Sequence, residues 1–391
     1  MTALPARWKS LSFDEAVEPI SDGGKRVDQS DYLREGKLPV IDQGEEFIGG
    51  YTNDESKAYT GPLPVVIFGD HTRRVKFVDF PFVIGAQGVK LLRPREGWFP
   101  RFFAYLLPTR ELPDRGYSRH YQFVRKLQFP QPPEPEQRRI VAEIEKQFTR
   151  LEAGVAALRR VQANLHRYRA AVLKAACESR LVATDTGKWK QATIKELGEV
   201  KGGKRLPAGH TYSEEPTSFP YIRVVDFSNG TVALENLKYL KAETQAAISR
   251  YTISKRDVYI SIAGTIGLVG VIPEMLDGAN LTENAAKICN LTGVLPKYLC
   301  CYLASLSGQS QIAGYTLATT QSKLALFRIE KIVVPLPPVA EQERIVAEVE
   351  RRLSVVEELS ALVTANLQRA TRLRQSILQQ AFEGKLVKAA T

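Results

Sequence analysis

The chain has 391 residues, of which 44% are hydrophobic and 25% charged. This length is typical of two or three domains, and the composition excludes disordered, collagen-like and disulfide-scaffold proteins. Lysine and arginine number 54 against 43 aspartate and glutamate, so the net charge is +11. The excess is spread along the chain, which favours folded domains that contact a polyanion over an extended footprint.

The cysteines and the apolar runs predict the compartment. The four cysteines are Cys177, Cys289, Cys300 and Cys301. None of them forms a C-x-x-C pair, so we expect neither a zinc site nor a redox pair, and we expect a reducing cytoplasm. Met1–Ser10 has no apolar core and predicts no signal peptide. Val258–Pro273, the most apolar uncharged run, is shorter than a membrane span.

Residues 1–133 predict a first β-rich head. Short apolar, β-branched runs between glycine and proline turns are typical of strands. These runs are Val65–Phe68, Val75–Phe77, Phe82–Ile84 and Val89–Leu92. Phe99–Leu107 predicts one short helix.

Residues 134–183 predict a long helix that pairs with another helix. Pro132 and Pro133 precede it, and Glu134 and Glu136 fall in its first turn, as at helix starts. Its apolar residues follow a 3,4 heptad spacing, the narrow stripe of a coiled-coil seam. The expected seam is Val141, Ile144, Phe148, Leu151, Val155 and Leu158, then Val161, Leu165, Tyr168 and Val172.

Residues 184–338 predict a second β-rich head, and residues 339–391 a second long helix. The expected strands are Tyr221–Val225, Val258–Ile262 and Leu268–Ile272, and the expected short helix is Pro296–Leu306. The seam of the second long helix is expected at Val346, Val349, Leu353, Val356, Val363 and Leu367, then Ala370, Leu373 and Ile377.

The two long helices are copies of one another. Pro132–Glu143 returns as Pro337–Glu348 after 205 residues, and the heads share the double-glycine turns Gly23–Arg26 and Gly202–Arg205. Two copies with narrow stripes favour mutual pairing over two unrelated helices that each pack on their own domain. Each helix of about 45 residues would be roughly 65 to 70 Å long. The residues alone leave parallel and antiparallel pairing open.

Two basic segments of the first head are candidates for nucleic-acid binding. Arg110–Lys126 interleaves five cations with aromatic side chains, and Gly69–Arg74 lies between two predicted strands. Cations suit phosphates, and planar side chains and arginine forks suit base edges. Looser counterparts in the second head are Ala263–Gly267 and Thr319–Lys323.

Each candidate has a structural alternative. The arginines after Arg110 are also consistent with a solvated face that neutralises Glu111 and Asp114. The two double-glycine turns are equally consistent with tight turns that carry exposed cations.

Motifs for catalysis are missing from the sequence. It contains no G-x-x-x-x-G-K-[ST], no H-E-x-x-H, no G-x-S-x-G and no Asn-Pro-Pro-Phe type of loop. Histidines and cysteines are too few and too scattered for a metal or nucleophilic site. We therefore expect no catalytic and no metal-binding residues on this chain.

The paired motifs carry a family resemblance. The P-P-x-x-E-Q-x-R-I helix starts at Pro132–Ile140 and Pro337–Ile345 alternate with two dissimilar β-rich heads. This arrangement resembles the specificity (S) subunit of type I restriction-modification enzymes, over essentially the whole chain. The Gly69–Arg73 loop, Gly264–Gly267 and Leu281–Asn284 are also similar to that family.

The resemblance implies a fold and a function. The fold would be α+β and pseudo-twofold symmetric, with two target recognition domains separated by two long helices in an antiparallel coiled coil. Each domain would read one half of a bipartite, asymmetric site on double-stranded DNA, and the coiled coil would fix the unread gap. Two modification (methyltransferase) subunits and the restriction (endonuclease/translocase) subunits would be the partners. S-adenosylmethionine, ATP and Mg²⁺ would be bound by those partners, with no cofactor on this chain.

Only loop positions transfer as candidate DNA contacts. In the first head they are His71, Arg73, Arg74, Arg119 and His120, with Lys25 and Arg26 of the double-glycine turn. In the second head they are Thr265, Gln321 and Lys323, with Lys204 and Arg205. A function of another class stays open: a non-catalytic coiled-coil adaptor whose heads bind protein or peptide partners.

Overall fold

The computed structural model describes residues 4–85, 88–113, 116, 118–182, 187, 189–316 and 322–387. The chain divides into two compact units, Met1–Leu158 with Ala365–Thr391, and Arg159–Thr364. Each unit contains one head, the start of one long helix and the end of the other. The boundary predicted between residues 183 and 184 lies outside the described residues, and the four segment limits stay a prediction.

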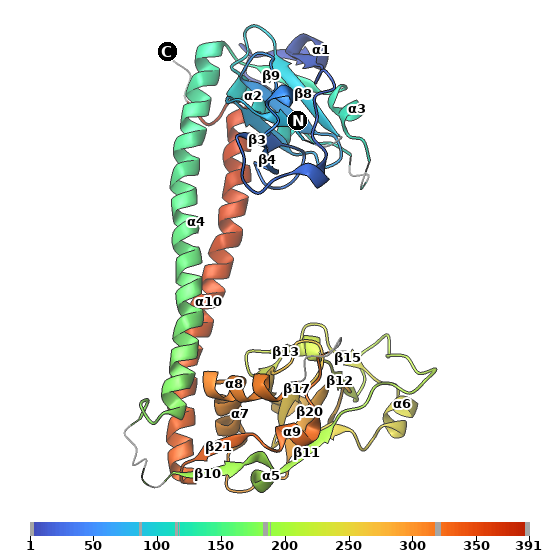
Figure 1. Cartoon of the computed structure of the whole chain (residues 1–391), viewed down its shortest axis with the longest axis vertical. Helices are drawn as coiled ribbons and strands as arrows, with labels where there is room; N and C mark the ends of the chain where they lie inside the picture. The colour runs from blue at the N-terminus through green and yellow to red at the C-terminus, as the bar shows by residue number, and fades with distance from the viewer. Residues whose placement is uncertain are drawn as a thin grey trace. The chain divides into compact units, whose positions relative to one another are not determined.

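Two long helices dominate the structure, α4 (Glu134–Cys177) and α10 (Val339–Phe382), each of 44 residues. Both begin directly after a proline pair and carry an acidic residue in the first turn, which the helix dipole favours. The predicted helices are confirmed, at nearly the expected length. Figure 1 shows α4 and α10 side by side.

The helices pair antiparallel within each unit. In the first unit, Ile144 near the start of α4 shares a core with Ile377 near the end of α10. In the second unit, Val172 near the end of α4 shares a core with Ile345 near the start of α10. The start of each helix therefore packs beside the end of the other, which confirms the antiparallel coiled coil.

One ion pair links the helices in each unit, and the two pairs are equivalent under the repeat. Arg374 Nη1 lies 3.1 Å from Glu152 Oε1 in the first unit, and Arg169 Nη1 lies 3.4 Å from Glu357 Oε1 in the second. The Arg374 guanidinium also lies 4.1 Å from the centroid of the Phe148 ring. Glu152, Arg374 and Glu357 are exposed and Arg169 is half-buried, so each pair adds little stability.

The expected seam residues lie inward with three exceptions. Buried residues are Val141, Ile144, Phe148, Val346, Val349, Val356 and Val363, and half-buried ones are Leu151, Val155, Leu158, Leu353 and Leu367. Val161, Tyr168 and Leu373 are exposed. The heptad spacing slips at these positions, because a straight helix drifts relative to a 3.5-residue repeat.

The first head is built from short strands and short helices. Its strands are β1 (Lys9–Ser12), β2 (Val17–Ile20), β3 (Leu38–Ile41), β4 (Gly50–Thr52), β5 (Val65–Gly69), β6 (Val75–Val78), β7 (Val83–Ile84), β8 (Val89–Pro94) and β9 (Gln128–Gln131). Its helices are α1 (Phe13–Ala16), α2 (Pro100–Leu106) and α3 (Tyr121–Val124). The predicted strands and short helix are present within a few residues.

The second head has a similar set of elements. Its strands are β10 (Lys190–Thr193), β11 (Glu199–Gly202), β12 (Pro220–Ile222), β13 (Phe227–Ser228), β14 (Thr231–Val232), β15 (Lys238–Tyr239), β16 (Thr252–Ile253), β17 (Val258–Ser261), β18 (Val269–Val271), β19 (Ala279–Leu281), β20 (Ala285–Cys289) and β21 (Val333–Leu336). Its helices are α5 (Ile194–Leu197), α6 (Ala242–Ala247), α7 (Pro296–Ala304), α8 (Leu306–Tyr315) and α9 (Leu326–Ile329).

One strand expected in the second head is shorter than the sequence suggested. The apolar run Tyr221–Val225 predicted strand to its end, but β12 stops at Ile222 and a 3₁₀ turn covers Val224–Asp226. Asp226 accepts hydrogen bonds from the backbone N–H and the guanidinium of Arg223, at 2.8 and 2.7 Å. This local capping turns the chain, which overrides the strand preference of the two valines.

The two heads repeat one strand order. In the first head the sheets are β1-β9, β2-β8-β5-β6 and β4-β3-β7, and in the second they are β10-β21, β11-β20-β17-β18, β15-β12-β19-β16 and β13-β14. The pairs β3-β7 and β12-β19 are both parallel, in heads that otherwise pair antiparallel strands. The faint repeat seen in the sequence is therefore a repeat of three sheets, to which the second head adds β16 and the β13-β14 pair.

A buried glutamine joins each head to its long helix. Gln137 Nε2 donates to the carbonyl oxygens of Gly97 and Pro132, both at 2.8 Å, and Gln137 Oε1 accepts from the Phe99 N–H at 2.7 Å. The side chain is fully buried. One amide thus binds two main-chain groups before α2 and one before α4.

The same joint recurs in the second unit. Gln342 Nε2 donates to the carbonyl oxygens of Gly293 and Pro337, both at 2.9 Å, and Gln342 Oε1 accepts from the Leu295 N–H at 2.8 Å. We call Gln137 and Gln342 the joint glutamines. They occupy the Gln of the two P-P-x-x-E-Q motifs.

We predict that Gln137→Leu lowers the free energy of unfolding of the first unit by about 2 to 4 kcal/mol, because the Phe99 N–H and the Pro132 carbonyl lose their side-chain partner and the Gly97 carbonyl keeps only Gln131 Nε2 at 3.2 Å. Urea unfolding measures the loss, and hydrogen exchange of the Phe99 amide should quicken. Gln147→Leu is the matched control, since the Gln147 amide donates at 3.0 Å to Glu143 of the same helix. Equal losses for the two variants would contradict the role of the joint.

Candidate nucleic-acid interface

The tip of the β5-β6 hairpin is a tight turn at the surface of the first head. Gly69 and Arg74 close the turn through the Gly69 N–H and the Arg74 carbonyl, and the Arg73 N–H donates to the Gly69 carbonyl, each at 2.8 Å. Arg73 has a φ of 59°, in the left-handed region that costs a residue with a Cβ roughly 1 kcal/mol or more. We call Asp70–Arg74 the first hairpin tip.

The first hairpin tip lies against the segment that precedes α3. The His120 N–H donates to the Asp70 carbonyl and the Tyr121 N–H donates to Asp70 Oδ1, both at 2.8 Å. Asp70 is buried, so its carboxylate is committed to this junction. The structure thus brings together the two basic segments that the sequence analysis proposed separately.

The predicted side chains differ in access to solvent. Arg73, Arg74 and Arg119 are exposed, and His71 is half-buried. The His120 ring is only 1% exposed, and its Nδ1 lies 3.1 Å from the Asp70 carbonyl oxygen. His120 therefore packs beneath the first hairpin tip as a buried structural residue, whereas the three arginines face solvent.

A loop that the sequence analysis did not single out also holds the tip. Gln43 accepts from the His71 N–H through Oε1 at 3.1 Å and from Thr72 Oγ1 through its carbonyl at 2.7 Å. Glu45 forms an ion pair with Arg74 at 3.3 Å. These contacts join residues far apart in the chain, which no local motif reveals.

The double-glycine turn of the first head is engaged within the protein. Arg26 forms an ion pair with Asp22, and its Nη2 donates to the Val89 carbonyl at 3.4 Å. Lys25 beside it is half-buried. Arg26 therefore carries a structural contact, as the tight-turn alternative expects, and Lys25 is the less constrained cation.

The second head places its predicted loops together in the same way. The tip of the β17-β18 hairpin, Ile262–Leu268, is closed by Ser261 Oγ, which donates to the Thr265 carbonyl at 2.6 Å. Ala263 forms a β-bridge with Lys323, and the Leu324 N–H donates to the Ile262 carbonyl at 3.0 Å. Thr265 and Lys323 are exposed. Gln321 lies outside the described residues. We call Ile262–Leu268 the second hairpin tip.

The double-glycine turn of the second head needs its second glycine. A Cβ on Gly203 would lie 2.1 Å from the Thr282 carbonyl oxygen, so only glycine lets the two backbones approach this closely. Lys204 follows, with its Nζ 5.7 Å from the centroid of the Tyr251 ring, and Arg205 pairs with Glu283 at 3.4 Å.

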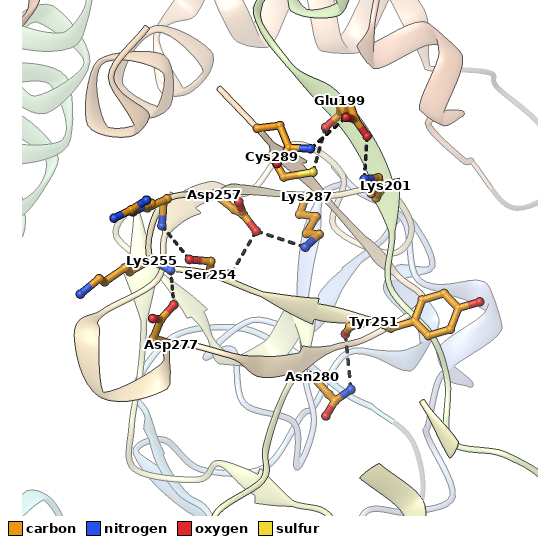
Figure 2. A network of polar contacts seen from close by, with 12 residues as sticks. Glu199, Lys201, Tyr251, Ser254, Lys255, Asp257, Asp277, Asn280, Lys287 and Cys289 are labelled. Carbon is orange, nitrogen blue, oxygen red and sulfur yellow. Dashed lines mark hydrogen bonds and ion pairs between the residues drawn. The ribbon is translucent and has the colours of Figure 1, made fainter. Parts of the chain in front are cut away.

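Figure 2 shows a network of polar contacts in the second head, on strands that include β11. Lys287 of β20 lies 3.3 Å from Asp257, which also accepts from the Ser254 N–H at 3.0 Å. On the neighbouring strand β11, Glu199 pairs with Lys201 at 2.6 Å, and its carbonyl lies 3.5 Å from Cys289 Sγ. The Lys287–Asp257 pair links β20 to the residue before β17, and the contact between Cys289 and Glu199 links β20 to β11. The second double-glycine turn extends from the end of β11.

The available cations are a small subset of the predicted ones. Within the described part of the chain, no carboxylate forms an ion pair with Arg119, Lys204 or Lys323, and all three side chains are exposed. Arg26, Arg74 and Arg205 each have a carboxylate partner. Arg119, Lys204 and Lys323 could bind a phosphate at the lowest cost in free energy, because none of them would first have to break an ion pair.

The thiols are not poised for chemistry. Burial raises the pKa of Cys177 to about 11 and that of Cys300 to about 12, so both stay protonated at neutral pH. Among the described residues, no cluster of three or more histidines, cysteines or carboxylates could hold a metal ion. Nor does any helix in the described ranges have a stretch long and apolar enough to cross a bilayer.

Comparisons with known proteins agree on one family. A family model described as the Type I restriction modification DNA specificity domain matches residues 186–366. The type I restriction enzyme EcoBI specificity subunit of Escherichia coli is 27% identical over an alignment of 415 positions, gaps included, which covers 97% of this chain and 86% of the relative. The EcoR124I/EcoR124II specificity subunit of the same species is 26% identical over an alignment of 372 positions, which covers 89% of this chain and 86% of the relative.

Solved structures share the fold. A chain from work on complex assembly and conformational transition of the type I R-M system has a TM-score of 0.72 and 20% identity, and the match covers 98% of this chain and 100% of that one. The HsdS subunit from Thermoanaerobacter tengcongensis has a TM-score of 0.50 and 19% identity, with 98% of each chain covered. The family resemblance drawn from the paired helix starts is confirmed.

We predict that Arg73→Gly leaves the stability of the first unit unchanged or raises it by up to about 1 kcal/mol, because glycine adopts the left-handed conformation without strain. The same change should weaken binding to duplex nucleic acid. Arg73→Ala, which removes the charge and keeps the strain, should lose affinity without gaining stability. Thermal unfolding and gel shifts measure both quantities. Destabilisation by Arg73→Gly would show that the side chain holds the tip together instead.

Proposed function

We propose that this chain is a type I restriction enzyme specificity subunit and that it reads a bipartite, asymmetric DNA site with one half-site per head. The single observation that carries the proposal is the pair of hairpin tips. Both heads hold a tip and a basic segment together with the same strand order, yet the residues differ: Asp70–Arg74 is rich in arginine, whereas Ile262–Leu268 has none.

Unlike tips on like scaffolds explain an asymmetric site. Two identical recognition domains related by a pseudo-twofold axis would bind a palindromic site. Here Arg73 and Arg119 of the first head face solvent where Thr265 and Lys323 stand in the second. The first set favours contacts to guanine edges and phosphates, and the second offers a hydroxyl and one cation.

The long helices serve as a ruler in this proposal. A continuous helix of 44 residues spans about 66 Å at 1.5 Å per residue. The two antiparallel helices together form the ruler, and each joint glutamine fixes a head to the start of one helix. The unread gap between the half-sites then follows from the helix length.

The chemistry belongs to partner subunits in this proposal. Two modification (methyltransferase) subunits and the restriction subunits would assemble with this chain in the cytoplasm, and they would bind S-adenosylmethionine, ATP and Mg²⁺. The chain itself contributes recognition and scaffolding without catalysis. The protonated thiols and the commitment of Asp70 to backbone contacts support this division of roles.

We predict that matched insertions of whole helical turns, between Leu158 and Leu165 in α4 and at the equivalent place in α10, change the gap and leave both half-site sequences intact. The register of each unit is preserved, because both helices lengthen together. Mapping the modified adenines in cells that carry the variant and its partners measures the site. A change in the recognised bases, with the gap unaltered, contradicts the ruler.

A second prediction tests the reading itself. Arg119→Ala should weaken recognition of one half-site by about 1 to 3 kcal/mol if its fork contacts a base edge. Lys126→Ala, an exposed cation in the same segment, is the control.

Binding of the assembled complex to duplex DNA should also fall steeply between roughly 50 and 200 mM salt. A flat salt response would favour the adaptor function, in which the heads bind protein or peptide partners.

A further inference from the structure

Phe327 is an aromatic side chain that the second head holds out to solvent. Its side chain is 57% exposed in α9, whereas Ile329 two positions later is fully buried in the core. The short helix thus turns one face inward and presents the phenyl ring on the other. An exposed ring of this size costs solvation free energy, so it is informative where it adjoins a candidate binding surface.

Cations surround the Phe327 ring. The Arg328 guanidinium carbon and the Lys331 Nζ each lie 5.7 Å from the ring centroid. Lys323, four positions earlier, is exposed and has no ion pair within the described part of the chain. A protein-binding patch typically depletes lysine, whereas a ring set among cations is typical of surfaces that bind nucleic acid.

The contacts of α9 place the ring between the two parts of the second head's interface. On one side, the Leu324 N–H donates to the Ile262 carbonyl of the second hairpin tip at 3.0 Å. On the other, Leu326 Cδ1 lies 3.6 Å from the position of a Cβ on Gly202, where the double-glycine turn begins. Phe327 therefore stands within the surface that the exposed cations define.

The first head has no aromatic at the corresponding position. The helices α3 and α9 are related by the same 205-residue shift as the long helices, which sets Gln122 opposite Phe327. Gln122 Nε2 turns back and donates to the Arg119 carbonyl at 3.1 Å. The two heads thus differ in their ability to stack on a base.

We propose that Phe327 inserts against the bases of the second half-site as a stacking wedge. The inference rests on the proposed function and adds a residue and a mode of contact to it. A phenyl ring can stack on an unstacked base or enter a base step, and the flanking cations neutralise the phosphates that such a distortion crowds together. Recognition of the second half-site then depends partly on how easily its sequence unstacks.

The test uses the assembled complex of this chain with its modification subunits, on its mapped DNA site carrying 2-aminopurine at successive positions of each half-site. We expect a rise in fluorescence at one step of the second half-site. Phe327→Ala should abolish the rise and weaken binding by about 10-fold, with the slope against salt unchanged because no charge is lost. Phe327→Trp should retain the rise.

Controls separate stacking from folding and from the proposed function. Met275→Ala removes a side chain of the same head that is 70% exposed, in the turn Glu274–Leu276, and it should change neither fluorescence nor affinity. Equal thermal stability of Phe327→Ala and the unaltered chain shows that the fold is kept. Site-specific binding with no difference between the two chains overturns the wedge alone. A complex that does not discriminate between DNA sequences overturns the proposed function and the wedge together.

Discussion

The start of each long helix meets its head at a fully buried glutamine amide, and the rest of the molecule depends on that joint. Gln137 and Gln342 each satisfy three backbone groups, and only the Gly97 carbonyl has a second side-chain donor in the described part of the chain, Gln131 Nε2 at 3.2 Å. A buried amide of this kind is costly unless all its hydrogen bonds form, so it permits one orientation of the loop before α2 or α7 and disfavours others. A reader of DNA needs such a fixed orientation, because base contacts tolerate little displacement.

Ion pairs reinforce the joints at the same equivalent positions. Arg101 of α2 pairs with Glu145 of α4 at 3.1 Å, and Lys297 of α7 pairs with Glu350 of α10 at 2.6 Å. The scaffold is thus repeated down to single side chains, whereas the hairpin tips are not. In the proposed function, this division would let the hairpin tips change without disturbing the helices that set their spacing. The left-handed Arg73 at one tip fits the view that strain is tolerated where function needs a particular side chain.

The sequence predicted the repeated elements well and the long-range contacts poorly. Proline pairs, acidic first turns and heptad spacing are local signals, and α4 and α10 follow them closely. The direction of pairing was not encoded in the same way, since a stripe of apolar residues suits a partner of either direction. The alignment of Gly69–Arg74 with Ala263–Gly267 also anticipated the two hairpin tips.

The failures concern residues whose role depends on distant backbone. The sequence suggested that His120 is a surface group beside arginines, but its ring is buried beneath the first hairpin tip. The cause is a long-range hydrogen bond: the His120 N–H donates to the carbonyl of Asp70, fifty positions away. Gln43 gave no sequence signal at all. The joint glutamines were visible as letters of a motif, yet nothing local shows that their amides bind Gly97 or Gly293. Long-range hydrogen bonds of this kind follow only from the folded chain.

Chemical cross-linking between the helices tests the central claim, that one chain builds the same antiparallel junction twice. Cysteines in place of Glu152 and Arg374, or in place of Arg169 and Glu357, should each be joined within one chain by a short bis-maleimide, because the side chains that they replace meet at 3.1 and 3.4 Å. Cysteines in place of Glu152 and Glu357, which a parallel pairing would bring face to face, should not. Cross-linking of that last pair, with neither of the first two closing, would contradict the account.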